Sequence, residues 1–194
     1  MFFKDFSSQL SQFLPLNNSL LNFLRQRLRQ VEPLRKQVLL QPGQVCRQLY
    51  HVNQGFFRIY REDATGHVTV DFAGAGEFLT IIPSFFDHTP SSHGMVCEAD
   101  AHIYELSYKD LLDLEELSPD FTSLSKAIIT KYMLGYYQDF DFYRQANATD
   151  RYQRLCQRYP NISNLVSQKD IASYLGMAPQ SLSRILREML LGNR

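Results

Sequence analysis

The last thirty residues constrain the fold most, because they follow the pattern of two helices joined by a tight turn. Ser167 and Asp170 have the spacing of a capping box, in which a hydroxyl and an acidic side chain satisfy the first backbone groups of a helix. Gly176 stands where a helix ends in a left-handed turn, and Pro179 stands where a second helix tolerates proline. Apolar residues recur at helical spacing on one side of each helix: Ile171, Ala172, Tyr174, Leu175, Leu182, Ile185, Leu186 and Met189. We therefore predict a helix-turn-helix; an ordinary helical hairpin is the alternative.

The outward face of the predicted second helix carries side chains that suit contact with DNA. An arginine such as Arg184 can bridge O6 and N7 of guanine, and a glutamine such as Gln180 can pair with adenine. Lys169 and Arg187 are better placed for phosphates, which position a protein without specifying sequence. The predicted DNA-binding set is Ser167, Gln168, Lys169, Pro179, Gln180, Ser181, Ser183, Arg184 and Arg187.

Charge is divided unevenly along a chain whose total is zero, with 20 basic and 20 acidic residues. From Arg151 onward there are seven basic residues and two acidic ones, so this segment carries +5 and the preceding 150 residues carry −5. A basic end on an acidic body is expected when one domain contacts phosphate groups. Arginines on a solvated helix face would give the same count, so the charge only supports the prediction.

The pattern of apolar and turn residues changes twice along the remaining sequence. Residues 6–34 have helical periodicity interrupted at Pro15, and residues 36–107 contain short β-type runs separated by turns. The runs include separate strands at 49–52 and 56–60 around a turn at 53–55, and a hairpin turn at 63–66. Strands at such regular spacing favour a β-roll, that is, a jelly roll or double-stranded β-helix. The predicted fold class is therefore α+β.

A long helix is predicted over residues 119–146, with apolar residues on two sides. One stripe has the 4-3-4-3 spacing of a coiled-coil seam: Ile129, Met133, Tyr136, Phe140 and Tyr143. Leu124, Ile128 and Tyr132 form the second stripe. We expect one stripe to pack on the roll and the other on a second copy of the chain, whereas a monomeric core helix is the alternative.

Several classes of protein do not fit this sequence. Cys46, Cys97 and Cys156 lack the spacing of a metal or cluster site and are expected to be reduced thiols. No apolar run approaches the ~20 residues that span a bilayer, and the N-terminus is not a secretory signal. No catalytic or phosphate-loop constellation is present, so the chain is not expected to be an enzyme. These features predict a cytoplasmic protein without membrane contact, metal or catalytic residues.

This order of elements resembles the cyclic AMP receptor protein and fumarate-nitrate regulator (CRP/FNR) family. Short phrases carry the resemblance further, among them Gly76-Glu77-Phe78, which is similar to the opening of the family's phosphate-binding segment. Others lie at 40–43, 49–55, 105–109 and 118–120. The resemblance implies a homodimeric bacterial transcription regulator with a cyclic nucleotide-binding-like, eight-stranded roll. Double-stranded DNA is the implied partner, and RNA polymerase is a further candidate. The implied domains are a sensor at 1–118, a dimerisation helix at 119–146 and a DNA-binding domain at 147–194.

The sensor half departs from the family's nucleotide-binding pattern. Thr80 and the residues after it offer no carboxylate for a ribose, and Ser91-Ser92-His93 offers no arginine for a cyclic phosphate. Tyr136 and Tyr137 stand where the cyclic AMP receptor has a small Thr-Ser pair. The candidate effector pocket is Gly76, Glu77, Phe78, Thr80, Ser91, Ser92, His93, Tyr136 and Tyr137. We expect that cyclic AMP is not the effector, and no cofactor is assigned.

Two further expectations concern DNA affinity and the alternative function. The sequence stops at 191–194, before the β-hairpin wing that usually follows, which predicts weaker DNA affinity and heavier reliance on dimerisation. A small-molecule sensing module with vestigial DNA binding is the alternative function.

Overall fold

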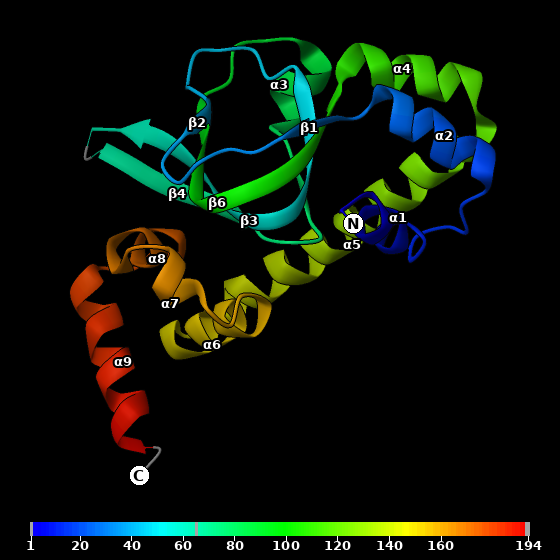
Figure 1. Cartoon of the computed structure of the whole chain (residues 1–194). Helices are drawn as coiled ribbons and strands as arrows, with labels where there is room; N and C mark the ends of the chain where they lie inside the picture. Colours follow the sequence, from blue (N-terminus) through cyan, green and yellow to red (C-terminus); the bar gives the residue numbers. More distant parts are fainter. Residues whose placement is uncertain (1, 65, 193–194) are drawn as a thin grey trace.

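The computed structural model describes residues 2–64 and 66–192 and shows a roll of strands, a long helix and a C-terminal group of helices (Figure 1). The helices are α1 (Phe2–Leu10), α2 (Asn18–Arg27), α3 (Ile82–Asp87), α4 (Tyr108–Leu117), α5 (Pro119–Gln145), α6 (Ala148–Arg158), α7 (Ile162–Leu165), α8 (Gln168–Tyr174) and α9 (Pro179–Gly192). The strands are β1 (Arg29–Val31), β2 (Val38–Leu40), β3 (Gln48–Asp63), β4 (Gly66–Ala73), β5 (Phe78–Leu79) and β6 (His93–Ser107). Thr65 of the expected hairpin turn and the last two residues of the sequence lie outside the described residues.

The two N-terminal helices pack on the core of the roll. Asn17 begins α2 by accepting a hydrogen bond from the Leu20 amide at 2.8 Å, the usual role of an N-cap side chain. Apolar residues of both helices are buried in the same cluster as the strands: Phe6, Leu10, Leu20 and Leu24. Arg27 then ties α2 to α4, because its guanidinium lies 3.0 Å from Asp110 and 3.1 Å from Asp113.

The strands form one antiparallel sheet in the order β1-β6-β3-β4, with β2 paired to β6 and β5 paired to β3. The two central strands are long: β3 has 16 residues, β6 has 15, and they pair from Gln48↔Ser107 to Arg61↔His93. Their register shifts around Gln54 and Phe56. Such irregularities let a strand bend without breaking the pairing, so the sheet curls into a roll.

The described residues contain six strands rather than the expected eight, and the predicted turn at 53–55 lies inside β3. Gly55 explains the difference. It has a φ of 106° and lies so close to Ala101 that a Cβ there would overlap it. Glycine adopts this conformation without strain, so the chain bends at a bulge and continues in the same strand. Strand β3 thereby takes the place of the two short strands expected at 49–52 and 56–60.

Helix α5 is 27 residues long and begins where the sequence predicts. Ser118 caps it by accepting a hydrogen bond from the Phe121 amide at 3.2 Å, and Pro119 occupies its first position. Phe121 and Leu124 are buried against the roll. No helix in the described part of the chain, α5 included, is long and apolar enough to cross a membrane.

A second core, distinct from that of the roll, joins the C-terminal helices to the sheet. It contains ten buried residues between Tyr152 and Ile185, together with Phe56 of β3 and Phe72 of β4. The Tyr159 ring lies edge-on to Phe56 at 5.0 Å between centroids, and the Tyr174 ring is 5.0 Å from that of Phe72. The C-terminal helices are therefore docked on the outer face of β3 and β4, as Figure 1 shows for α8.

Candidate nucleic-acid interface and its junction with the roll

The start of α8 has the predicted cap. The Ser167 hydroxyl accepts a hydrogen bond from the Asp170 amide at 3.1 Å and donates one to the Asp170 carboxylate at 2.6 Å. At the other end, Gly176 has a φ of 65°, and the Met177 amide donates to the Ala172 carbonyl at 3.0 Å. This is the hydrogen-bond pattern of a helix that ends in a left-handed residue. Both ends of α8 thus lie where the sequence predicts them.

Helix α9 turns its apolar side to α8 and its polar side to solvent. Leu182 and Ile185 are buried in the same cluster as the apolar residues of α8. The Arg184 side chain is 74% exposed and has Glu188, one turn away, at 3.9 Å. The Ser183 hydroxyl donates to the Gln168 side chain at 3.4 Å, which places the first turn of α8 beside α9. In Figure 1, α9 runs away from the roll, so the sheet does not cover it.

The nine residues of the predicted DNA-binding set therefore lie on two neighbouring surfaces. Ser181 is half-buried, and the other eight are exposed: Ser167, Gln168, Lys169, Pro179, Gln180, Ser183, Arg184 and Arg187. The arrangement offers cationic and amide side chains on a convex helix face. Side chains of this kind on such a face can reach base edges and phosphates of a duplex.

The predicted effector residues mostly have local partners. Thr80 donates to the Gln48 carbonyl at 2.9 Å, and the buried Ser91 donates to the His93 carbonyl at 2.9 Å, so both hydroxyls have local partners. Tyr136 and Tyr137 are 72% and 73% exposed on α5. Ser92 is bonded to the His93 ring at 3.1 Å. Phe78 and Glu77 contact α5 and α6, respectively.

A hollow at the roll is formed by other residues. It has a volume of about 430 Å³, is open to solvent and is lined by both polar and apolar groups, with Arg47 and Gln48 among the polar ones. The remaining lining residues are Leu39, Leu40, Gln44, Val45, Cys46, Tyr50 and Met95. The size lies within the usual range of small-molecule sites.

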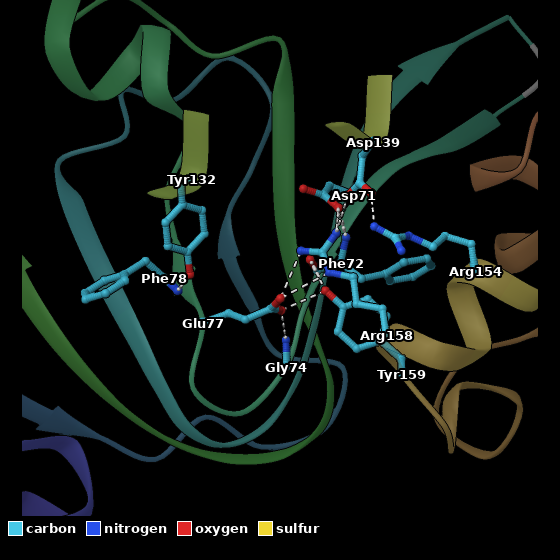
Figure 2. A network of polar contacts seen from close by, with 10 residues as sticks. All are labelled: Asp71, Phe72, Gly74, Glu77, Phe78, Tyr132, Asp139, Arg154, Arg158 and Tyr159. Atoms are coloured by element: carbon cyan, nitrogen blue, oxygen red, sulfur yellow. Dashed lines mark hydrogen bonds and ion pairs between the residues drawn. The ribbon is translucent and has the colours of Figure 1, made fainter. Parts of the chain in front are cut away.

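Glu77 joins the roll to α6 (Figure 2). One carboxylate oxygen accepts hydrogen bonds from the Arg158 guanidinium at 2.9 and 3.2 Å. The other accepts from the Tyr159 hydroxyl at 2.7 Å and from the Gly74 amide at 2.7 Å. The Tyr159 oxygen also lies 2.9 Å from the Phe72 carbonyl, so its single proton is shared between that carbonyl and Glu77. Hydrogen bonds of this kind to a charged group are about twice as strong as neutral ones.

More charged groups surround this contact. Arg158 is also 3.9 Å from Asp71 of β4 and 3.9 Å from Asp139 of α5. Asp139 is in turn 3.0 Å from Arg154 of α6. Burial, reinforced by the charge of Glu77, raises the pKa of Tyr159, so its hydroxyl remains a donor. Burial alone would lower the pKa of Arg158, but the neighbouring carboxylates of Glu77 and Asp71 raise it more, so the guanidinium stays charged.

A separate contact holds α8 on the sheet. Arg58 of β3 is buried and donates to the buried carboxylate of Glu98 at 2.7 Å. The same guanidinium lies 3.4 Å from Asp170, so the capping residue of α8 also pairs with the roll. The Thr69 amide of β4 donates to the Ser173 hydroxyl at 3.0 Å.

Sequence reasoning missed these contacts. It assigned Glu77 to a ligand segment and Asp170 to a cap only, because the partners are distant: Arg158 is 81 positions from Glu77. One signal was available. Arg58 is a single charge between apolar residues of a strand, and a charge buried there needs a partner.

The helix α5 leaves most of its predicted seam uncovered. Ile129 and Phe140 are each 51% exposed, Met133 is 63% exposed and Tyr136 is 72% exposed. Tyr143 differs, since it is half-buried with its ring 6.2 Å from that of Tyr174. It is the second stripe that contacts the roll: Leu124 is buried there, and the Tyr132 hydroxyl, although this residue is 37% exposed, accepts a hydrogen bond from the Phe78 amide at 2.8 Å.

The chain is similar to a known domain family in sequence over part of its length, and to known regulators in fold over most of it. Residues 31–116 match the family model of the cyclic nucleotide-binding domain, and no curated protein matches the sequence. CLP, a c-di-GMP-responsive global regulator of Xanthomonas campestris, has a TM-score of 0.68 at 19% identity, over 91% of this chain and 93% of that one. FixK2 of Bradyrhizobium japonicum has a TM-score of 0.67 at 14% identity, over 86% of each chain. The catabolite activator protein of Thermus thermophilus has a TM-score of 0.56 at 18% identity, over 95% and 88%. Residues 31–116 are therefore similar in sequence to cyclic nucleotide-binding domains, and the chain shares the fold of these three regulators.

Proposed function

We propose that this chain is a dimeric, DNA-binding transcription regulator of the CRP/FNR type that reads a two-fold operator through α9. The observation that carries the proposal is the exposed polar face of α9, with Arg184 at its centre and the capped start of α8 beside it. A recognition helix reads base edges from its N-terminal part, where Gln180, Ser183 and Arg184 lie. The exposed cations of this surface, Lys169, Arg184 and Arg187, support attraction to phosphate.

Dimerisation through α5 follows from its uncovered apolar stripe. Large apolar residues gathered on one exposed surface are typical of an interaction site, and their 4-3-4-3 spacing suits a second copy of the same helix. A two-fold dimer would present two α9 helices to two half-sites about one helical turn apart.

Cyclic AMP is not proposed as the effector. The position expected to hold a ribose-binding carboxylate carries Thr80, and the position expected to hold a phosphate-binding arginine carries Ser91 and Ser92. The nearby carboxylate of Glu77 is engaged by Arg158 and Tyr159. A cyclic phosphate would therefore lack the bidentate cation that such sites use.

The test is selection of the purified chain against a random duplex pool, at two salt concentrations, with and without cyclic AMP. We expect an enriched two-fold site without ligand, with affinity that falls at the higher salt concentration and is unchanged by cyclic AMP. A pool without enrichment under every condition contradicts DNA reading. Enrichment only with cyclic AMP contradicts the proposed independence from that ligand.

A second candidate, a small-molecule sensing module with vestigial DNA binding, is favoured by the 430 Å³ hollow at the roll. Its test is a thermal-shift screen with a library of small uncharged compounds. A compound that raises the Tm of a chain that enriches no duplex would favour this second candidate.

A further inference from the structure

The turn at residues 74–78, here called the coupling turn, contacts three parts of the molecule at once. It is fastened to β3 by two backbone hydrogen bonds, from the Gly76 amide to the Val52 carbonyl at 2.7 Å and from the Val52 amide to the Glu77 carbonyl at 2.9 Å. It meets α5 through the Phe78 amide, which donates to the Tyr132 hydroxyl. It meets α6 through the side chain of Glu77 (Figure 2). A displacement of this turn therefore changes contacts with the roll, α5 and α6 together.

The Glu77 contact is well suited to hold α6 in one position. Two guanidinium bonds on one oxygen and the Tyr159 hydroxyl on the other define both the distance and the direction of the helix. Tyr159 is 8% exposed, so water cannot readily replace its partners. Because α6 leads through α7 into α8 and α9, its docking is one of the contacts that set where α9 points, beside those of α8 with the sheet.

The surrounding charges show what remains when Glu77 is neutralised. Arg158 keeps Asp71 and Asp139 at 3.9 Å each, so its charge is still compensated. Arg58 with Asp170, and Thr69 with Ser173, still hold α8 to the sheet. Loss of the Glu77 carboxylate should therefore loosen the docking of α6 without unfolding the C-terminal core.

We propose that the coupling turn is a regulatory latch: Glu77, by binding Arg158 and Tyr159, sets the position of the DNA-binding helices on the roll. This inference rests on the proposed function, whose α9 surface it regulates. In the latched arrangement the polar face of α9 is exposed, so the latch favours DNA binding by holding α9 in one orientation before the duplex arrives. An effector or partner that moves the coupling turn would release α6 and lower the affinity for a two-fold site.

The test combines amide hydrogen exchange with binding to a selected two-fold duplex, in the full chain. The variants are Glu77→Gln and Tyr159→Phe, and the matched control is Glu116→Gln, which neutralises an exposed acid of α4. We expect exchange in α6 about tenfold or more faster in both variants, the effect of losing a charge-assisted hydrogen bond. We also expect weaker duplex binding, by about tenfold, and tolerance of a wider range of half-site spacings. The control should match the wild type in each respect.

Two results would overturn the latch. One is unchanged exchange in α6 of both variants, and the other is faster exchange with unchanged duplex affinity and spacing preference. If the wild-type chain enriches no duplex at all, the proposed function fails, whereas the exchange data still decide whether Glu77 holds α6 on the roll.

Discussion

Arg184→Ala is the sharpest test of base reading, because the structure separates its effect on DNA from its effect on stability. The side chain is 74% exposed, and its pair with Glu188 is an exposed i,i+4 pair at 3.9 Å. Such pairs contribute about 0.3–0.5 kcal/mol, and alanine is the better helix former. The free energy of unfolding should therefore change by less than about 0.5 kcal/mol.

The expected loss of binding is much larger. A bidentate arginine–guanine contact contributes about 1–3 kcal/mol of discrimination. A dimer on a two-fold site makes this contact twice, so the variant should lose about 2–6 kcal/mol on the selected duplex. At about 1.4 kcal/mol per factor of ten, this is a loss of about 30-fold to about 10⁴-fold. Binding to unrelated duplexes should change far less, because it depends mainly on phosphate contacts.

The assay is fluorescence anisotropy with three duplexes: the selected site, the same site with one guanine replaced in each half, and a scrambled sequence. Wild type should discriminate the first from the second, and Arg184→Ala should not. Arg187→Ala, on the same exposed face, is the matched control and should weaken binding to all three evenly. An even loss from Arg184→Ala would refute the assignment of this residue to base reading. Thermal unfolding of each variant checks that stability is unchanged.

Three further outcomes are expected. Lys169→Ala should weaken binding evenly across sequences. In titrations at several salt concentrations, it should reduce the slope of log affinity against log salt by about 1 per subunit. A loss that depends on sequence would contradict the assignment of Lys169 to phosphate contact. Burial lowers the pKa of His51 to about 4, below its usual 6.5. Between these two pH values, His51 therefore binds a proton in the unfolded chain but not in the folded chain. The free energy of unfolding should therefore fall by about 2 kcal/mol from pH 7 to pH 5 in denaturant titrations, and that part of the slope should vanish in His51→Gln. In sedimentation experiments, Met133→Asp should convert the expected dimer to a monomer, because Met133 lies on the exposed seam. Gln138→Asp, which lies off the seam, should leave the dimer intact. A wild-type chain that is monomeric at every concentration would contradict the dimer.

Local features of the fold could be predicted because their causes are local. Ser167 caps α8, Gly176 ends it and Pro179 begins α9, each through hydrogen bonds or backbone angles confined to a few neighbouring residues. The length of α5 followed in the same way, from an uninterrupted helical pattern between Ser118 and Ala146. The exposed positions of the candidate DNA-binding residues are consequences of this periodicity.

Contacts between distant segments could not be predicted in this way. Glu77 has the sequence context of a ligand-binding segment, yet its partners are Arg158 and Tyr159, more than 80 positions away. Phe56 was expected in a separate short strand, whereas Gly55 lets β3 continue and places Phe56 in the C-terminal core.

Backbone preferences and amphipathic periodicity act over a few residues, so the order and type of most helices, and the outward face of α9, can be inferred from the sequence alone. The pairing of charges across the junction depends instead on how the roll curls and where α6 docks, which many weak contacts decide together. A carboxylate binds whichever cation the fold brings within about 3 Å. For Glu77 that cation is Arg158, and only the assembled molecule shows it.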